Sequence, residues 1–156
     1  MRNRAIFILI CLALAHPVRG DEAGHHLNSV SAFLGVTSEG RRQGASTLGL
    51  EYERRLSENW FITPAIEHAF GDLDFSVLAL TLGYRFNRWA IYAGPGVEWA
   101  EHEHEDGVET RSEFLFRTGV LYELEVGHLI VAPHALVDFV ADDQVAVFGV
   151  TVGVNF

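Results

Sequence analysis

The chain has 156 residues, of which 49% are apolar and 21% are charged, with one cysteine and a net charge of −10. This composition fits a single domain and excludes a disordered or collagen-like chain. No run of 18 apolar residues occurs, which excludes a membrane-spanning helix, and the negative charge has the wrong sign for a nucleic-acid binder.

The first twenty residues have the composition of a secretory signal peptide. Arg2 and Arg4 precede an apolar run over 5–15, and small residues end the segment at Gly20. We expect residues 1–20 to be removed and residues 21–156 to form one domain, in preference to a buried N-terminal helix or strand. Cys11 would be lost with this segment, so neither a disulfide nor a thiol nucleophile is expected.

Eight segments of the remaining chain alternate between apolar and polar or small residues. This period of two predicts β-strands, and each segment is long enough for a tilted strand to cross a bilayer. The segments are 27–37, 45–56, 60–70, 75–86, 89–100, 112–124, 128–140 and 145–156. We therefore predict an all-β fold, an eight-stranded antiparallel up-and-down transmembrane β-barrel.

The connections alternate in length, as they do in a meander of antiparallel strands. Tight turns are predicted at 57–59, 87–88 and 125–127, and longer polar loops at 38–44 and 101–111. Two further connections, 71–74 and 141–144, are short. Little loop material is therefore available for a surface activity.

Aromatic residues collect near both ends of the predicted strands, as two interfacial girdles require. Those beside the tight turns are Tyr52, Trp60, Tyr84, Phe86, Trp89, Tyr122 and Phe156, and those near the opposite ends are Phe70, Trp99, Phe114 and Phe139. A soluble ligand-binding barrel of the lipocalin type would point its apolar face inward and has no need of such girdles. We keep it as a remote alternative.

The faces opposite the apolar ones carry charged residues, which cannot face lipid. We expect them to line the lumen as a network of hydrogen-bonded pairs that fills an eight-stranded barrel. The predicted luminal network is Glu51, Glu53, Arg55, Glu67, Arg85, Glu98, Glu113, Arg117, Glu123, His134 and Asp138.

The end of the chain resembles the C-terminal signal of bacterial outer-membrane barrels, in which a final aromatic residue follows alternating apolar ones. The residues concerned are Val150, Val152, Val154 and Phe156. The whole pattern is similar to the small OmpX/OmpA-type eight-stranded barrels and to porin-like or transporter-like outer-membrane proteins of Gram-negative bacteria. The resemblance implies location in the outer membrane, contact with its lipid and lipopolysaccharide, reading of the last strand by the barrel-assembly machinery, and a monomeric state.

Three prolines lie inside predicted strands, where each removes a donor from the hydrogen-bond ladder. Because a closed barrel has no free edge, we expect bulges or widened pairings at Pro64, Pro95 and Pro133.

Two groups of residues could carry chemistry, and each of them also has a structural explanation. His102 and His104 project to one side of an extended segment and are weak candidates for a metal site, but an acidic solvated loop explains them as well. His25 and His26 are weaker still. No cofactor is expected.

A lipid A-modifying enzyme would need a serine, a histidine and an acid near the outer surface. His134 and Asp138 share a luminal face, and Ser76 or Ser112 could supply a hydroxyl, but four residues along a strand is about 13 Å, too long for a hydrogen bond. We therefore favour a non-catalytic outer-membrane barrel of structural or surface-interaction type. A narrow cation-leaky channel and a lipid A-modifying enzyme remain as alternatives.

Overall fold

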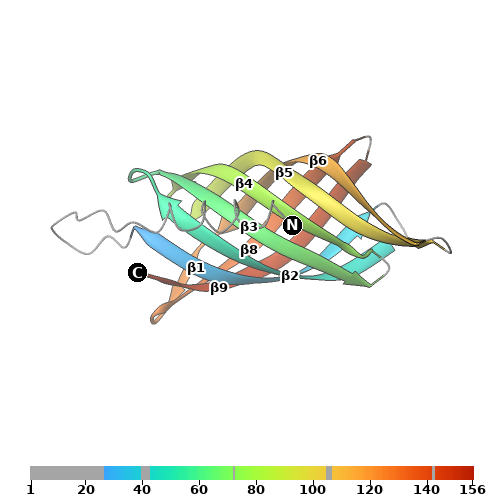
Figure 1. The fold of residues 1–156 in the computed structure, drawn as a ribbon. Helices are drawn as coiled ribbons and strands as arrows, with labels where there is room; N and C mark the ends of the chain where they lie inside the picture. Colours follow the sequence, from blue (N-terminus) through green and yellow to red (C-terminus); the bar gives the residue numbers. More distant parts are fainter. Residues whose placement is uncertain (1–26, 40–42, 72, 105–106, 142) are drawn as a thin grey trace.

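The computed structural model is a closed antiparallel β-barrel (Figure 1). It describes residues 27–39, 43–71, 73–104, 107–141 and 143–156, without the side chains of residues 43 and 101–110. The strands are β1 (Asn28–Glu39), β2 (Gln43–Arg55), β3 (Trp60–Gly71), β4 (Phe75–Phe86), β5 (Trp89–His104), β6 (Gly107–Tyr122), β7 (Leu124–Val126), β8 (Leu129–Val140) and β9 (Asp143–Asn155). Across the described ranges, no helix is long and apolar enough to cross a membrane.

Each strand pairs with its neighbours in sequence, and β9 pairs with β1 to close the barrel. Strand β7 continues β6, because both pair with β8 in one unbroken register, from Leu115↔Val140 to Val126↔Leu129. The nine strands therefore occupy eight positions in the barrel wall; we call each position a stave, and β6 and β7 together form one stave. The predicted fold class is confirmed.

The connections at one end of the barrel are tight, and the paired residues Asn28 and Phe156 lie at the same end. We call this the turn end and the opposite end the loop end. Asn87 adopts a left-handed conformation with φ 56° in the β4–β5 turn, and Gly127 does so with φ 65° in the β7–β8 turn. The last turn therefore lies at Gly127 and His128 and not at 125–127, because Glu125 and Val126 still pair with β8.

The three internal prolines interrupt the ladder without shifting it. Pairing between β2 and β3 stops at Glu51↔Ala65 and resumes in the same register at Arg54↔Ile62, so that Pro64 lies in the gap. The same two-pair gap occurs opposite Pro95, between β4 and β5, and opposite Pro133, between β6 and β8. The expected widened pairings are present, and no extra residue is inserted as a bulge would require.

Two predicted loops are mostly strand. β1 and β2 pair out to Glu39↔Gln43, and β5 and β6 pair out to His104↔Gly107, so the polar loops expected at 38–44 and 101–111 are wrong. The sequence of these segments is polar and has no apolar alternation, so the period of two did not mark them as strands.

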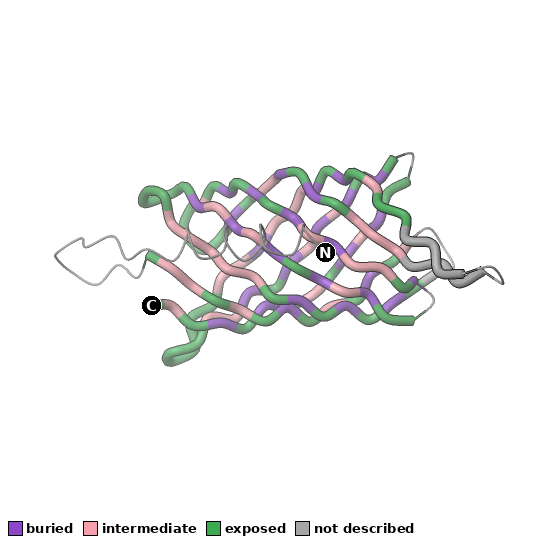
Figure 2. Tube along the Cα trace, in the orientation of Figure 1, coloured by how far each residue is buried: buried purple, intermediate pink, exposed green. Residues whose placement is uncertain are grey.

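Burial alternates along most of the strand length whose side chains the structure describes, as Figure 2 shows, and β7 is the exception because all three of its residues are exposed. Large apolar side chains such as Leu34, Leu50, Leu82 and Phe148 are exposed on the outer wall, whereas Phe33, Phe61 and Leu115 are buried inside. The outward aromatic residues include edge-to-face pairs at the turn end, Trp60 with Tyr84 and Trp89 with Tyr122. The arrangement is the reverse of a lipocalin-like soluble barrel.

Candidate functional site

Inside the barrel, one arginine binds two carboxylates. Arg117 of β6 donates from Nε and Nη2 to Asp138 of β8, each at 2.7 Å. Its Nη1 and Nη2 donate to the two carboxylate oxygens of Glu67 on β3, across the lumen. All three side chains are only 3% exposed. Two bidentate pairs on one guanidinium are strong, charge-assisted contacts with fixed geometry, so they hold these three side chains together inside the barrel.

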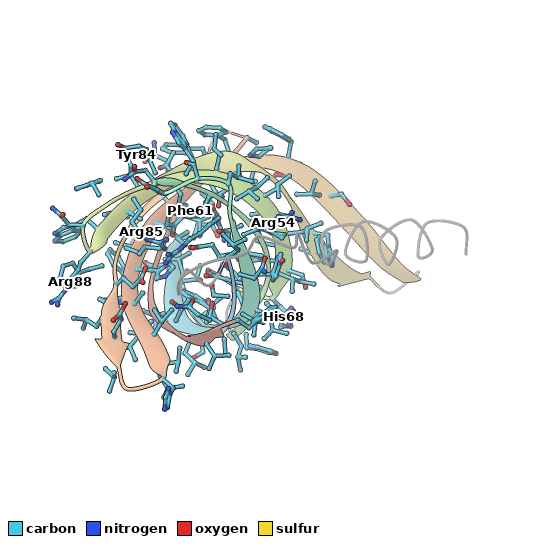
Figure 3. All side chains as sticks on the ribbon, turned by 90° about the vertical axis from the view of Figure 1, so that its left-hand side faces the viewer. Arg54, Phe61, His68, Tyr84, Arg85 and Arg88 are labelled. Atoms are coloured by element: carbon cyan, nitrogen blue, oxygen red, sulfur yellow. The ribbon has the colours of Figure 1, made fainter. Side chains whose placement is uncertain are left out.

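A second cluster lies nearer the turn end (Figure 3). Arg85 of β4 donates to both oxygens of Glu53 at 3.0 and 2.9 Å, and it contacts Glu123 at 2.9 Å. Its guanidinium carbon lies 4.9 Å from the centre of the Phe61 ring. Arg55 approaches Glu53 at 3.8 Å. The cluster joins β2, β4 and the chain between β6 and β7 across the interior.

His134 belongs to a separate, uncharged set of contacts. Its Nδ1 lies 3.2 Å from the hydroxyl of Tyr92, and its Nε2 lies 3.0 Å from the hydroxyl of Thr151. Asp138 is bound to Arg117, so His134 and Asp138 do not form a catalytic pair. This agrees with the separation expected from strand geometry.

The remaining predicted luminal residues lie on the inner face without joining these clusters. Glu98 and Glu113 are ladder partners near the loop end, and Glu113 contacts Arg111 at 2.7 Å. Glu51 lines a luminal cavity of about 60 Å³ that lies toward the turn end. Polar groups from the Arg85, Arg117 and His134 sets also line this cavity, which therefore has room for water between them.

The candidate assembly signal lies on β9. Val150, Val152 and Val154 point outward, and the backbone of Phe156 exchanges hydrogen bonds of 2.9 and 3.2 Å with Asn28. The last residue is therefore fixed to the first strand at the turn end, where β9 and β1 close the barrel.

The candidate metal ligands lie outside the described side chains. His25 and His26 fall in the undescribed segment, and His102 and His104 have a described backbone only. No group of three metal-ligating side chains occurs among those that the structure describes.

One polar group was missed by the sequence analysis. His68 lies on the outer face of β3, outside the ring of strands in Figure 3, and bonds to Ser76 on β4. The sequence held a signal for this contact, because the two residues lie four positions on either side of residue 72, within the short 71–74 connection, and hairpin residues placed symmetrically about a turn face each other.

Neither a protein-family model nor a curated protein matches the chain. Among solved structures, the N-terminal β-barrel domain of Pseudomonas aeruginosa OprF has a TM-score of 0.62 at 15% identity, covering 82% of this chain and 97% of that one. Ail, the attachment invasion locus protein of Yersinia pestis, has a TM-score of 0.53 at 16% identity, covering 83% and 96%. Neisserial surface protein A has a TM-score of 0.52 at 11% identity, with the same coverage.

These similarities concern the fold. The chain has the fold of the small eight-stranded outer-membrane β-barrels, and the resemblance predicted from the sequence is confirmed at that level.

Proposed function

We propose that the chain is an integral outer-membrane β-barrel of structural or surface-interaction type, with a closed polar lumen. Its apolar outer wall is the partner for membrane lipid, and its last strand is the segment read by the assembly machinery. The tight turns face the periplasm and the loop end faces outward, as is usual in such barrels. The barrel acts as a monomer.

One observation carries this proposal, namely an outwardly apolar wall around the buried Arg117 cluster. A soluble barrel gains stability by burying its apolar face, whereas here that face is exposed and the ions are inside. Lipid reverses the preference, because a charged side chain facing the bilayer midplane costs about 2–4 kcal/mol.

The surface role is constrained by charge. Ail has been solved in complex with the heparin analogue sucrose octasulfate. The present chain carries a net charge of −10, which opposes the approach of a sulfated polyanion. We therefore propose lipid and neutral or cationic surface partners for this chain and not sulfated polysaccharides.

Heat-modifiable migration tests the proposal. The membrane fraction is run on a denaturing gel with and without boiling, and the chain is detected with an antibody. A band that shifts on boiling and that requires detergent for extraction supports a membrane barrel. Recovery in the soluble fraction without a shift would overturn it.

A narrow cation-leaky channel is the second candidate, favoured by the excess of acids inside the barrel. Seven predicted luminal acids face three arginines, and several of them line the cavity at the turn end. Single-channel recording in planar bilayers distinguishes the two candidates. Discrete, cation-selective conductance steps favour the channel, and a silent bilayer with a heat-modifiable barrel favours the closed lumen.

A further inference from the structure

A serine, a histidine and an aspartate meet on the outer face of the barrel at the loop end. His68 and Ser76 are direct ladder partners of β3 and β4. Nδ1 of His68 lies 2.8 Å from the hydroxyl oxygen of Ser76, and Nε2 lies 3.6 Å from a carboxylate oxygen of Asp74. One imidazole therefore has a hydroxyl at one nitrogen and a carboxylate near the other.

These are the parts that activate a serine nucleophile. The imidazole accepts the hydroxyl proton, and the carboxylate stabilises the imidazolium that forms. We propose that Ser76, His68 and Asp74 form an esterase site that cleaves acyl esters of membrane lipids. The inference rests on the membrane placement proposed above.

The outer wall beside this group provides a place for an acyl chain. A shallow depression of about 390 Å³ lies over β2, β3 and the start of β4, and both His68 and Ser76 line it. Its other side chains are mostly apolar: Leu48, Leu50, Ile66 and Phe70. An acyl chain lying in it would contact hydrocarbon and end beside a hydroxyl.

The depth of the group matches the ester region of a bilayer. The ring of Phe70 packs edge-on against His68 with 4.2 Å between ring centres, and Trp99 is the ladder partner of Ser76 on β5. Aromatic girdles lie at the headgroup level, where lipid ester carbonyls also lie. Leu50 and Ile66 pair one step deeper toward the membrane centre.

The exposure of the three side chains increases from Ser76 through His68 to Asp74. Ser76 is half-buried, the side chain of His68 is 36% exposed, and that of Asp74 is 76% exposed. Asp74 is thus on the water side, and its contact with the imidazole is the loosest of the group. We expect Asp74→Asn to reduce the rate less than substitution of Ser76 or His68.

The reaction balances with water as the co-reactant. The hydroxyl oxygen of Ser76 attacks the ester carbonyl while its proton moves to Nδ1 of His68. The ester C–O bond then breaks, the leaving alcohol takes that proton, and an acyl ester remains on Ser76. Water, deprotonated by His68, attacks this ester, releases the fatty acid and restores the serine.

The test uses the refolded full-length barrel and a matched serine control. Ser112 points outward at the same end, but its ladder partner is Trp99 and not a histidine. The wild type, Ser76→Ala, His68→Gln and Ser112→Ala are incubated with phosphatidylethanolamine vesicles and, separately, with lipopolysaccharide micelles. Fatty acid release is measured by mass spectrometry, and labelling of Ser76 is measured with a fluorophosphonate probe.

We expect release and labelling with the wild type and Ser112→Ala, and a loss of about 100-fold or more in Ser76→Ala and His68→Gln. The lipid that is hydrolysed identifies the source of the ester. Labelling of Ser76 without release from either lipid would overturn the lipid substrate, and equal release from Ser76→Ala would overturn the site. The absence of both signals would mean that His68 and Ser76 are only a cross-strand hydrogen-bonded pair. Heat-modifiable migration of each variant tests folding and membrane placement separately.

Discussion

Arg117 and Asp138 are joined by two hydrogen bonds of 2.7 Å in the interior of the barrel, and the same guanidinium also holds Glu67 from the opposite wall. Arg117 and Asp138 are ladder partners on β6 and β8, whereas Glu67 comes from β3, so the cluster ties β3 to a strand pair with which it shares no ladder. Removing the cation leaves two buried carboxylates without a partner, which costs more than the cluster contributes when intact.

Arg117→Met is therefore expected to lower the free energy of unfolding by about 3–5 kcal/mol. The measurement is urea unfolding of the barrel refolded in lipid vesicles. Arg111→Met is the matched control, because the Arg111 side chain is 75% exposed and its ion pair contributes little. Adding Glu67→Gln and Asp138→Asn to Arg117→Met should recover part of the loss, and no recovery would contradict this account.

Arg85→Gln should destabilise the barrel by a smaller amount, about 1–3 kcal/mol. The side chains of Arg85, Glu53 and Glu123 are 12–16% exposed, so water compensates part of the lost contact. A double-mutant cycle between Arg85→Gln and Glu53→Gln isolates their interaction. Additive effects of the two substitutions would show that the pair is not coupled.

Gly94→Ala tests the close approach of two strands beside Pro95. A Cβ at Gly94 would overlap the backbone oxygen of Leu80 and would lie 2.7 Å from Cα of Thr81, and neither backbone atom can move aside as a flexible side chain can. We expect a loss of about 1–3 kcal/mol in unfolding free energy. Gly44→Ala is the control, because its nearest neighbour would be 3.8 Å away, and an equal loss there would contradict the explanation.

Leu80→Arg tests the direction of the outer wall. Leu80 is exposed near the middle of β4, so the membrane placement predicts a loss of about 2–4 kcal/mol for an arginine there. Val126→Arg, at the turn end, should cost about 0–1 kcal/mol. Vesicle unfolding of both variants gives the comparison, and similar values for both would contradict a membrane-spanning wall.

Phe156→Ala tests the predicted assembly signal. Refolding in detergent should be nearly unchanged, because the backbone bonds of residue 156 with Asn28 do not require its side chain. Accumulation of heat-modifiable barrel in cells should fall if Phe156 belongs to the assembly signal proposed above. Phe148→Ala, also exposed on β9, is the control.

The staves and the luminal face could be predicted because both follow from the period of two. Successive side chains of a strand point to opposite faces, so alternation with the apolar residues was enough to predict that Glu67, Arg117 and Asp138 lie inside. Their mutual contact could not be predicted, because Glu67 and Arg117 lie on non-adjacent strands. Cross-lumen distances depend on the tilt and stagger of the closed barrel, which no single strand encodes.

The contact between His68 and Ser76 was within reach of sequence reasoning, because the register of a short hairpin follows from its turn. It was missed because polar residues were sought on the inner face alone. The long β5–β6 hairpin was missed for a different reason. Its outer part has no apolar face, so alternation gives no signal there even though backbone pairing continues to His104.

The proline gaps divide the barrel wall unevenly. Each of the three falls between strands joined at the turn end, whereas β8, β9, β1 and β2 form a four-stave sheet whose ladders are continuous. Backbone amides opposite the prolines lack a ladder partner, so hydrogen exchange should start at these three seams. The wall therefore consists of one sheet with continuous ladders and two hairpins, β3–β4 and β5–β6, whose ladders to their neighbours are interrupted. On heating, we expect the barrel to open first at the three interrupted ladders and only later between β1 and β9.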